Sequence, residues 1–170
     1  MKIATWNVNS LRVRLPHVLD WAGKTQPDIL AIQETKVLDQ NFPIEDINNA
    51  GYQSVYSGQK TYNGVAILSK TQAEEVVTDI PGLDDPQRRL LAATFGDIRV
   101  LNVYIPNGQS VDSEKYAYKL DWLDKLTAYI KEQLKQYPQL VLLGDFNIAP
   151  DDRDVHDPEQ WEGKILCSKA

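Results

Sequence analysis

The chain has 170 residues, a formal net charge of −6, a hydrophobic content of 42% and a charged content of 25%. These values are those of an ordinary globular domain, and the acidic charge means that nucleic-acid binding would need a local basic surface or a metal ion. No apolar stretch reaches membrane-spanning length, and a single cysteine, Cys167, excludes an internal disulfide. We therefore expect one domain over residues 1–170, in the cytoplasm and without a membrane partner.

The N-terminal part of the chain predicts a strand–helix–strand unit. Residues 2–9 have the apolar pattern of a first strand, and the run Ile29–Gln33 predicts a second, buried strand. Between them we expect a helix that has Pro16 in its first turn and ends at Gly23, because these residues suit the two ends of a helix. Arg12 and Arg14 precede this helix and are expected in the connecting loop. The strand–helix–strand order favours a parallel pair of strands.

The middle of the chain predicts shorter elements. We expect a short helix and three strands, over residues 42–50, 52–56, 64–68 and 76–78. A turn-rich loop over residues 58–64 contains Lys60 and Tyr62. This basic and aromatic combination suits a nucleic-acid backbone, although a plain hairpin loop fits the same residues.

The C-terminal half predicts a hairpin, a long helix and a final strand. Strands at 90–95 and 98–105 are joined by a two-residue turn, Gly96–Asp97. A helix over 113–137 has an apolar stripe with helical spacing, made of Tyr116, Leu120, Leu123, Ile130 and Leu134. The apolar run Leu140–Leu143 predicts a strand that is buried on both faces.

Polar side chains follow three of the predicted strands. They are Asn7 with Asn9, Glu34 with Lys36, and Asp145 with Asn147. Residues i and i+2 of an extended chain point the same way, so each pair is expected to leave its strand side by side. Parallel neighbouring strands would bring the pairs to one rim, where α/β sheets bind ligands. A polar turn is the alternative for the Asn7 and Asp145 pairs, and a plain ion pair is the alternative for Glu34 with Lys36.

These strand ends offer oxygen ligands, which suit a hard divalent cation such as Mg²⁺ or Mn²⁺. A metal held by few carboxylates keeps water ligands and takes up substrate phosphate, which favours hydrolysis of a phosphate ester. Tyr104 lies near a strand end, from which its hydroxyl could reach the same site. The sequence has no Gly-x-x-x-x-Gly-Lys loop, which argues against a nucleoside-triphosphate switch. His17 and His156 share no ligand spacing and are expected to be ordinary surface or helix residues.

Six segments have the order and spacing of a known family. They are Trp6–Asn9, Gln33–Lys36, Gly64–Leu68, Gln87–Arg89, Asn102–Gly108 and Gly144–Asn147. Through them the chain closely resembles exodeoxyribonuclease III, within the endonuclease/exonuclease/phosphatase superfamily, over essentially its whole length. The combination of Gln-Glu-Thr-Lys with Gly-Asp-Phe-Asn is the specific part of the resemblance.

The resemblance implies an α/β fold, a four-layer sandwich of two packed mixed sheets flanked by helices. It also implies a Mg²⁺-dependent DNA phosphodiester hydrolase of base excision repair, in which Mn²⁺ can substitute. Such an enzyme acts on double-stranded DNA as a 3′→5′ exonuclease and cuts beside abasic sites, and we expect it to be a monomer at full length. The implied metal ligands are Asn7, Glu34, Asp145 and Asn147. The implied catalytic residues are Tyr104, Asp145 and Asn147, and the implied DNA contacts are Lys36, Lys60, Arg88 and Asn107.

The family pattern continues with an Arg-Ile-Asp strand and a terminal Ser-Asp-His, and neither occurs in this sequence. Residues 154–157 differ from that pattern in order and context. We therefore expect an N-terminal portion of the enzyme, incomplete at its C-terminus, with poor solubility and little activity by itself. Two alternatives stay open. One is a phosphodiesterase or phosphatase for a small phosphate ester, and the other is a non-catalytic DNA- or partner-binding module.

Overall fold

Two β-sheets pack face to face in the computed structural model, which describes residues 1–168. Within these residues each sheet has four strands. The first sheet has the order β1 (Ile3–Asn7), β2 (Ile29–Gln33), β4 (Val65–Ser69) and β3 (Gln53–Ser57). The second has the order β5 (Glu74–Thr78), β6 (Leu90–Phe95), β7 (Ile98–Tyr104) and β8 (Leu140–Asp145).

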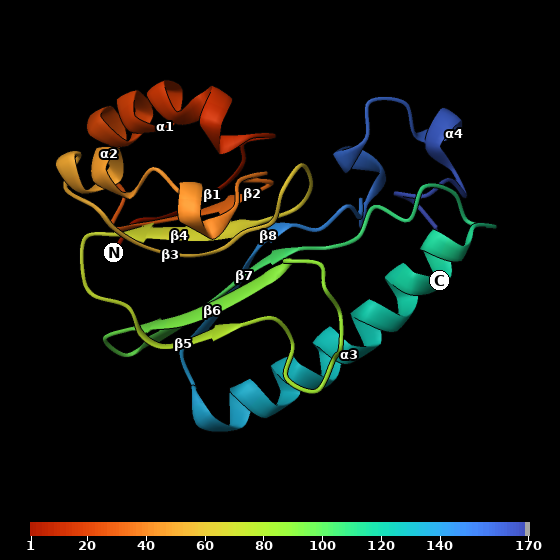
Figure 1. The fold of residues 1–170 in the computed structure, drawn as a ribbon. Coiled ribbons are helices and arrows are strands. Elements are labelled where there is room, and N and C mark those ends of the chain that lie inside the picture. The colour runs from red at the N-terminus through yellow and green to blue at the C-terminus, as the bar shows by residue number, and fades with distance from the viewer. Residues whose placement is uncertain (169–170) are drawn as a thin grey trace.

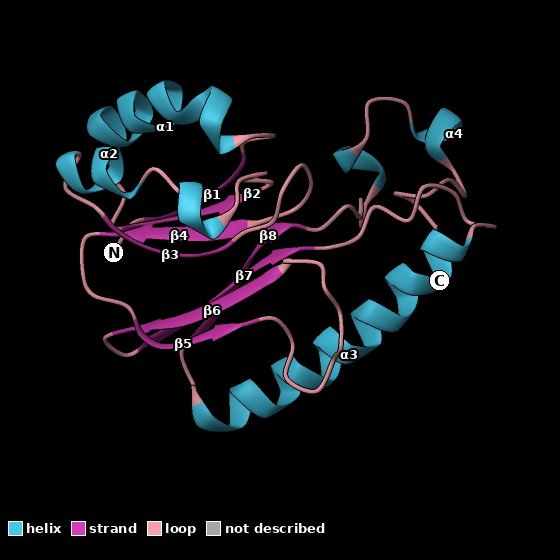
Figure 2. Ribbon diagram, in the orientation of Figure 1, coloured by secondary structure: helices cyan, strands magenta, loops and turns pink. Residues whose placement is uncertain are grey.

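Helices cover the outer faces of both sheets (Figures 1 and 2). The described helices are α1 (Leu11–Thr25), α2 (Ile44–Asn49), α3 (Glu114–Gln136) and α4 (Pro158–Trp161), with short 3₁₀ turns at Asp39–Asn41 and Asp152–Asp154. The helices α1 and α2 lie on the first sheet and α3 lies on the second. None of the described helices combines the length and the apolar character that crossing a lipid bilayer requires.

The alternation of side chains along β2 explains the layers. Leu30 and Ile32 belong to the hydrophobic layer beneath α1 and α2, while Ile29 and Ala31 belong to the layer between the sheets. Successive residues of a strand point to opposite faces, so an unbroken apolar strand can serve two layers at once. A third layer joins the second sheet to α3 through Trp122. The expected four-layer sandwich of two mixed sheets is confirmed.

Both sheets are mixed in the same way. In the first sheet, β1 and β2 are parallel and pair Asn7 with Gln33 at their ends. In the second, β7 and β8 are parallel and pair Tyr104 with Asp145. The other pairs are antiparallel. Each sheet therefore has a parallel pair, and these pairs supply the strand ends from which the polar side chains emerge.

A buried amide joins the two sheets. Asn102 of β7 has no exposed surface, and its Nδ2 donates to the main-chain oxygens of Ile32 (3.0 Å) and Ala66 (2.9 Å) in the opposite sheet. Gln33 Nε2 donates to Asn102 Oδ1 (2.7 Å) and to Thr5 Oγ1 (2.9 Å). Because buried amides need such partners, this network sets how the sheets lie on one another.

The first helix differs from the prediction at both ends. It begins at Leu11, so both arginines lie inside it rather than in a loop, and Pro16 stands within the helix. A proline there leaves the carbonyl of Arg12 without its usual donor, but both residues are exposed, so water can satisfy that carbonyl. The helix continues past Gly23 and ends where Gln26 adopts a left-handed conformation (φ 51°).

Two burial predictions were also wrong. All residues of β8 are half-buried rather than buried, because β8 pairs only with β7 in the described part of the chain. In α3, Leu134 is 52% exposed, and the buried positions are Tyr116, Lys119, Trp122, Leu126 and Gln133. The buried stripe of α3 is rotated relative to the predicted apolar stripe, because Lys119 and Gln133 have hydrogen-bond partners beneath the helix. The other predicted elements agree with the structure to within two residues at either end.

Candidate active site

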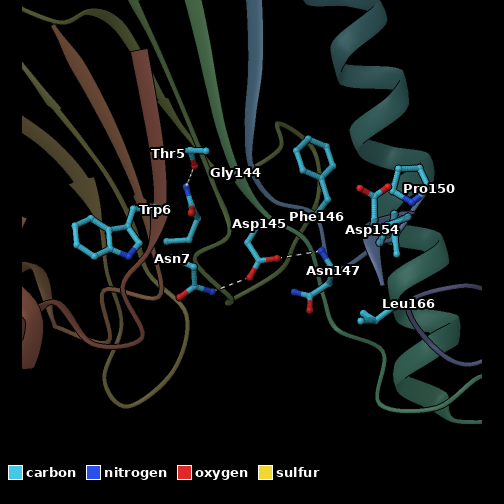
Figure 3. A pocket seen from close by; sticks show the side chains of 13 residues that line it. Thr5, Trp6, Asn7, Gly144, Asp145, Phe146, Asn147, Pro150, Asp154 and Leu166 are labelled. Carbon is cyan, nitrogen blue, oxygen red and sulfur yellow. Dashed lines mark hydrogen bonds between the residues drawn. The ribbon is translucent and has the colours of Figure 1, made fainter. Parts of the chain in front are cut away.

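The side chain of Asn7 lies between two carboxylates that come from different sheets. Its Nδ2 donates to Glu34 Oε1 (2.8 Å) and to Asp145 Oδ2 (2.7 Å). Figure 3 shows the bond to Asp145. The parallel pairing of β1 with β2 puts Asn7 beside Glu34, and β8 delivers Asp145 from the second sheet. The structure thus brings these three predicted residues together at one rim, but the rim spans both sheets rather than following one.

The two polar pairs at the ends of β1 and β8 are turns. The backbone N–H of Asn9 donates to Asn7 Oδ1 (3.0 Å), and that of Asn147 donates to Asp145 Oδ1 (3.1 Å). Asn9 and Asn147 have φ values of 45° and 49°, which are left-handed rather than extended. The predicted extended alternation was therefore wrong, and the alternative of a turn closed by an Asn or Asp side chain applies to both pairs.

The segment after β2 has an unusual backbone. Glu34 and Lys36 have φ values of 54° and 52°, a conformation that costs non-glycine residues energy and concentrates at functional sites. Backbone bonds hold the segment, from Ser10 to the oxygen of Glu34 (2.7 Å) and from Thr35 to that of Gly64 (3.1 Å). A Cβ on Gly64 would lie 2.1 Å from Thr35 Oγ1, so only glycine fits there. The surrounding chain therefore imposes the conformation that presents Glu34.

Two opposing effects act on the carboxyl of Glu34. Burial favours the neutral acid, but the side chains of Asn7, Lys36 and Tyr104 outweigh it and hold the pKa of Glu34 below its ordinary value. Lys36 Nζ is 2.8 Å from Glu34 Oε2 and also donates to Asn9. Burial, followed by the charge of Glu34, raises the pKa of Tyr104 to about 12. Near neutral pH the site therefore has a charged carboxylate beside a protonated phenol.

The amides of Asn107 and Asn147 are linked. Asn107 Nδ2 donates to Asn147 Oδ1 (3.0 Å), and Asn147 Nδ2 donates to the main-chain oxygen of Ile105 (3.0 Å). A carboxamide has two N–H donors, and the bond to Ile105 uses one of those of Asn147. These contacts orient the Asn147 amide beside Asp145.

Residues of the candidate site line two cavities. One, of about 560 Å³, is lined by Asn7, Asp145 and Asn147 (Figure 3). The other, of about 700 Å³, is lined by Tyr104 and Asn107. The bond between Asn107 and Asn147 joins the two walls, so a ligand with extended polar groups can contact both cavities at this point.

The predicted DNA contacts lie in different settings. Lys60 is exposed on its loop, and Lys36 is paired with Glu34. The guanidinium of Arg88 forms an ion pair with Asp79, whereas Arg89 lines the larger cavity. The Arg89 guanidinium carbon lies 4.9 Å from the centre of the Tyr104 ring.

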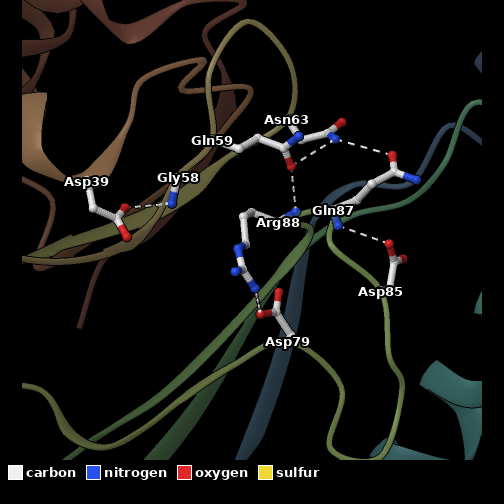
Figure 4. Close-up of polar contacts among 8 residues, drawn as sticks. All are labelled: Asp39, Gly58, Gln59, Asn63, Asp79, Asp85, Gln87 and Arg88. Atoms are coloured by element: carbon white, nitrogen blue, oxygen red, sulfur yellow. Dashed lines mark hydrogen bonds and ion pairs between the residues drawn. The ribbon is translucent and has the colours of Figure 1, made fainter.

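A network of amides fixes the loop over residues 58–64 against the start of β6 (Figure 4). Gln59 Oε1 accepts from the backbone N–H of Arg88 (2.8 Å) and from Asn63 Nδ2 (3.2 Å). Asn63 Nδ2 also donates to Gln87 Oε1 (3.2 Å). The loop that presents Lys60 is therefore attached at both of its sides to the wall of the larger cavity.

Sequence reasoning did not single out Lys119, and it counted Arg89 with Arg88 in a basic face without choosing it as a DNA contact. Arg89 precedes Leu91 of β6 by two residues, so both side chains are expected on the same face, the one toward the opposite sheet. This alternation could have distinguished Arg89 from Arg88. Lys119 is only 2% exposed and contacts the loops that carry Asn107 and Asn147. In the sequence, Lys119 stands three residues after Tyr116 and three before Trp122, and this spacing puts it on the same buried face of the helix.

Among residues 1–168, no three histidine, cysteine, aspartate or glutamate side chains are grouped as a metal site. The carboxylates of Glu34 and Asp145 instead meet at one amide, that of Asn7. The two carboxylates are hard oxygen donors, and Mg²⁺ is typically bound by one or two carboxylates while it keeps several waters. The donor set therefore fits this metal.

Two mixed sheets between helical layers, with carboxylates and amides where the strand ends of both sheets meet, define an α/β sandwich with a polar site at its rim. The Endonuclease/Exonuclease/phosphatase family matches residues 4–164, and the chain belongs to this family. The resemblance stated from the sequence is thereby confirmed.

Individual relatives agree with this assignment. Exodeoxyribonuclease III of Haemophilus influenzae is 36% identical over 179 residues, which cover 99% of this chain and 67% of the relative. The 3′ phosphatase NExo from Neisseria, solved with a product DNA hairpin, is 50% identical with a TM-score of 0.98, covering 99% of this chain and 66% of that one. An AP endonuclease from Archaeoglobus fulgidus is 42% identical with a TM-score of 0.93, covering 98% and 65%. The chain spans about two thirds of the length of these proteins.

Proposed function

We propose that the full-length protein containing this chain is a metal-dependent DNA phosphodiester hydrolase of base excision repair. It acts on double-stranded DNA as a 3′→5′ exodeoxyribonuclease and as an endonuclease at abasic sites. The observation that carries the proposal is the Asn7 amide held between Glu34 and Asp145 at a rim flanked by two cavities. DNA as substrate is supported by relatives named exodeoxyribonuclease III and AP endonuclease and by the neighbour solved with a DNA hairpin.

The proposed metal is Mg²⁺, for which Mn²⁺ can substitute. Glu34 is the main ligand, Asp145 is the second carboxylate, and the amide oxygens of Asn7 and Asn147 complete the proposed donor set. For Asn7 this requires that the amide turn, because its Nδ2 faces both carboxylates. When bound, the metal neutralises charge on the phosphate and lowers the barrier to attack by water. The pKa of Glu34, held below its ordinary value, keeps that carboxylate charged and ready for a cation.

The remaining chemistry is assigned to three side chains. Asp145 orients the attacking water and takes its proton, and the turn formed with Asn147 holds the carboxylate in place. Asn147 donates an amide N–H to a phosphoryl oxygen. Tyr104 donates its hydroxyl to the scissile phosphate, a role that its raised pKa supports because the phenol stays protonated.

DNA is proposed to contact the basic and amide groups around the larger cavity. The predicted contacts are Lys36, Lys60, Arg88 and Asn107. For Arg88 this requires that the guanidinium turn from Asp79 to a phosphate. A single domain, a monomeric state at full length and a cytoplasmic location also stay predictions.

The test is to purify the full-length product of the reading frame and to assay it with Mg²⁺ and with EDTA. The substrates are a duplex with one abasic site, a duplex with a recessed 3′ end, sphingomyelin and an inositol phosphate. We expect Mg²⁺-dependent cleavage of both duplexes. A clear preference for a small phosphate ester would overturn the DNA assignment, and DNA binding without cleavage would favour a binding module. Residues 1–170 assayed alone, at the same concentration, test the prediction that they cleave weakly.

A further inference from the structure

Lys119 on α3 is a lysine buried beneath the candidate site. It is 2% exposed, and its Nζ lies 2.6 Å from the main-chain oxygen of Asn147 and 3.3 Å from that of Asn107. We propose that Lys119 is a positioning residue, whose ammonium holds these two asparagines in the geometry that the reaction needs. The inference rests on the proposed function.

The two asparagines belong to loops that leave the second sheet side by side. Asn107 follows β7 and Asn147 follows β8, and these strands are parallel neighbours. The side chains are joined by one hydrogen bond of 3.0 Å, from Asn107 Nδ2 to Asn147 Oδ1. Asn147 Nδ2 also donates to the main-chain oxygen of Ile105 (3.0 Å). Lys119 is the group that joins the main-chain oxygens of Asn107 and Asn147 themselves. Because Lys119 contacts both main chains, the loops cannot shift past one another at Asn107 and Asn147 without breaking one of its contacts.

The loop after β7 rests directly on the lysine side chain. A Cβ on Gly108 (φ +88°) would lie 3.1 Å from Lys119 Cδ and 2.8 Å from Ile165 Cδ1. The glycine therefore allows the backbone to approach more closely than any other residue would. As a result the carbonyl of Asn107 comes within reach of the ammonium.

A buried ammonium is expensive, which makes its presence informative. Removing a charge from water costs several kcal/mol, and an apolar residue of similar volume often serves stability equally well. The rest of this helix face already includes Trp122 and Leu126 in the core. The charge at position 119 is therefore better explained by the two carbonyls that it holds than by the packing of α3.

Gln133 offers a matched comparison on the same helix. It is also buried (8% exposed), and its Oε1 accepts a hydrogen bond of 2.9 Å from Arg99 Nε. Its partner Arg99 also bonds Glu75 O and Thr94 Oγ1, at the far side of the second sheet from the candidate site. Gln133→Met thus removes a buried polar contact of α3 without touching the loops after β7 and β8.

The kinetic test uses the full-length protein and DNA cleavage with Mg²⁺. In Lys119→Met we expect kcat to fall about 10- to 100-fold with KM nearly unchanged, since small displacements of reacting groups can cost that much. Lys119→Arg keeps the charge and donors and should recover part of kcat. Gln133→Met should retain kcat after correction for the folded fraction. A kcat of Lys119→Met close to that of wild type, or an equal loss in Gln133→Met, would overturn the inference.

A second readout needs no catalysis and separates this inference from the proposed function. Amide hydrogen exchange is measured at Asn147 and Gln109, whose N–H groups donate to Asp145 Oδ1 (3.1 Å) and Asn107 Oδ1 (3.1 Å). Exchange at both should be faster in Lys119→Met but not in Gln133→Met. If the wild-type protein cleaves no DNA, the proposed function fails while exchange still decides the role of Lys119. If Lys119→Met does not fold, Lys119→Gln supplies the same two readouts.

Discussion

The two sides of the candidate site are held in place by different means. On the side of the first sheet, Glu34 and Lys36 form an ion pair of 2.8 Å. The Glu34 side chain is 17% exposed and the Lys36 side chain is 26% exposed. On the side of the second sheet, Asp145 is held by a backbone N–H and an Asn side chain, and the carbonyl of Asn147 by a buried lysine. Both sides have a turn and a tight glycine contact. The first side adds an ion pair that stays partly exposed, and the second adds a buried lysine.

The two sides should respond differently to substitution. Removing a charge that water partly screens changes the local electrostatics and leaves the chain where it is. Disturbing a buried hydrogen bond or a tight backbone contact displaces main chain and, with it, every side chain that the main chain presents. The side of the second sheet should therefore be the more sensitive to substitution.

The largest effect is expected for Asp145→Asn. The amide has the same shape and can still accept the bond from the N–H of Asn147, but it cannot take a proton from water. The kcat for DNA cleavage by the full-length protein should fall about 10²- to 10⁴-fold. Asp20→Asn makes the same chemical change at a position paired with Lys24 on the surface of α1, and should leave kcat unaltered. More than a tenth of the wild-type kcat in Asp145→Asn would show that Asp145 has a different role.

The next largest effect is expected for Gly144→Ala, which tests the close backbone contact between β8 and β7 on the side of the second sheet. A Cβ at position 144 would lie 1.9 Å from the main-chain oxygen of Val103, and φ is +145°. Strain and overpacking together should lower the free energy of unfolding by about 2–4 kcal/mol, measured by urea denaturation. The control is Gly23→Ala in α1, where nothing lies within 4 Å, and this change should stabilise by about 0.5–1 kcal/mol. Equal stabilities of the two variants would contradict the prediction.

A smaller effect is expected on the first side for Glu34→Gln, which removes the charge of the proposed main ligand. Isothermal titration of Mg²⁺ should show an affinity at least about tenfold weaker, since even residues that only support metal ligands contribute this much. Glu45→Gln, at an exposed position of α2, is the matched control. Unchanged Mg²⁺ affinity in Glu34→Gln would make the assignment of Glu34 wrong.

The smallest effect is a pH dependence of stability on the same side. The folded-state pKa of Glu34 lies below its ordinary value of 4.5, because hydrogen bonds from Asn7, Lys36 and Tyr104 outweigh burial. The stabilisation by the charged form is therefore complete above pH 4.5 and is lost as the pH falls through the lower folded-state pKa. In EDTA, the difference in Tm between wild type and Glu34→Gln should shrink between pH 7 and pH 3. A difference that is constant or grows on acidification would contradict this.

Much of the fold could be predicted because its signals are local. The apolar runs of β2 and β4 and the turn at Gly96–Asp97 can be recognised from neighbouring residues alone, and the structure contains each of them. The predictions failed where burial depends on distant partners. The half-burial of β8 follows from its having one neighbouring strand within residues 1–168. The polar residues on the buried face of α3 follow from Arg99 and from loops far along the chain.

The candidate site was predictable in its residues and less so in its geometry. A polar side chain directly after a buried strand indicated Asn7, Glu34 and Asp145, since strand ends are where such side chains gather. The arrangement followed from features that the spacing does not contain, namely the turns after Asn7 and Asp145 and the packing of one sheet on the other. Lys119 was missed for a similar reason, because a lysine is expected at the surface unless its partners are known.

The buried amide of Asn102 has a consequence for how this molecule can move. Its bonds to Ile32, Ala66 and Gln33 exist in only one position of the two sheets. Sliding one sheet over the other would leave those groups buried without partners, at about 1–3 kcal/mol for each. Shear between the layers, a common way for packed elements to open a cleft, is thereby resisted at the centre of the fold. Adjustment of the site to a bound substrate is therefore left to the loops beyond the strand ends, while the sheets act as a fixed frame.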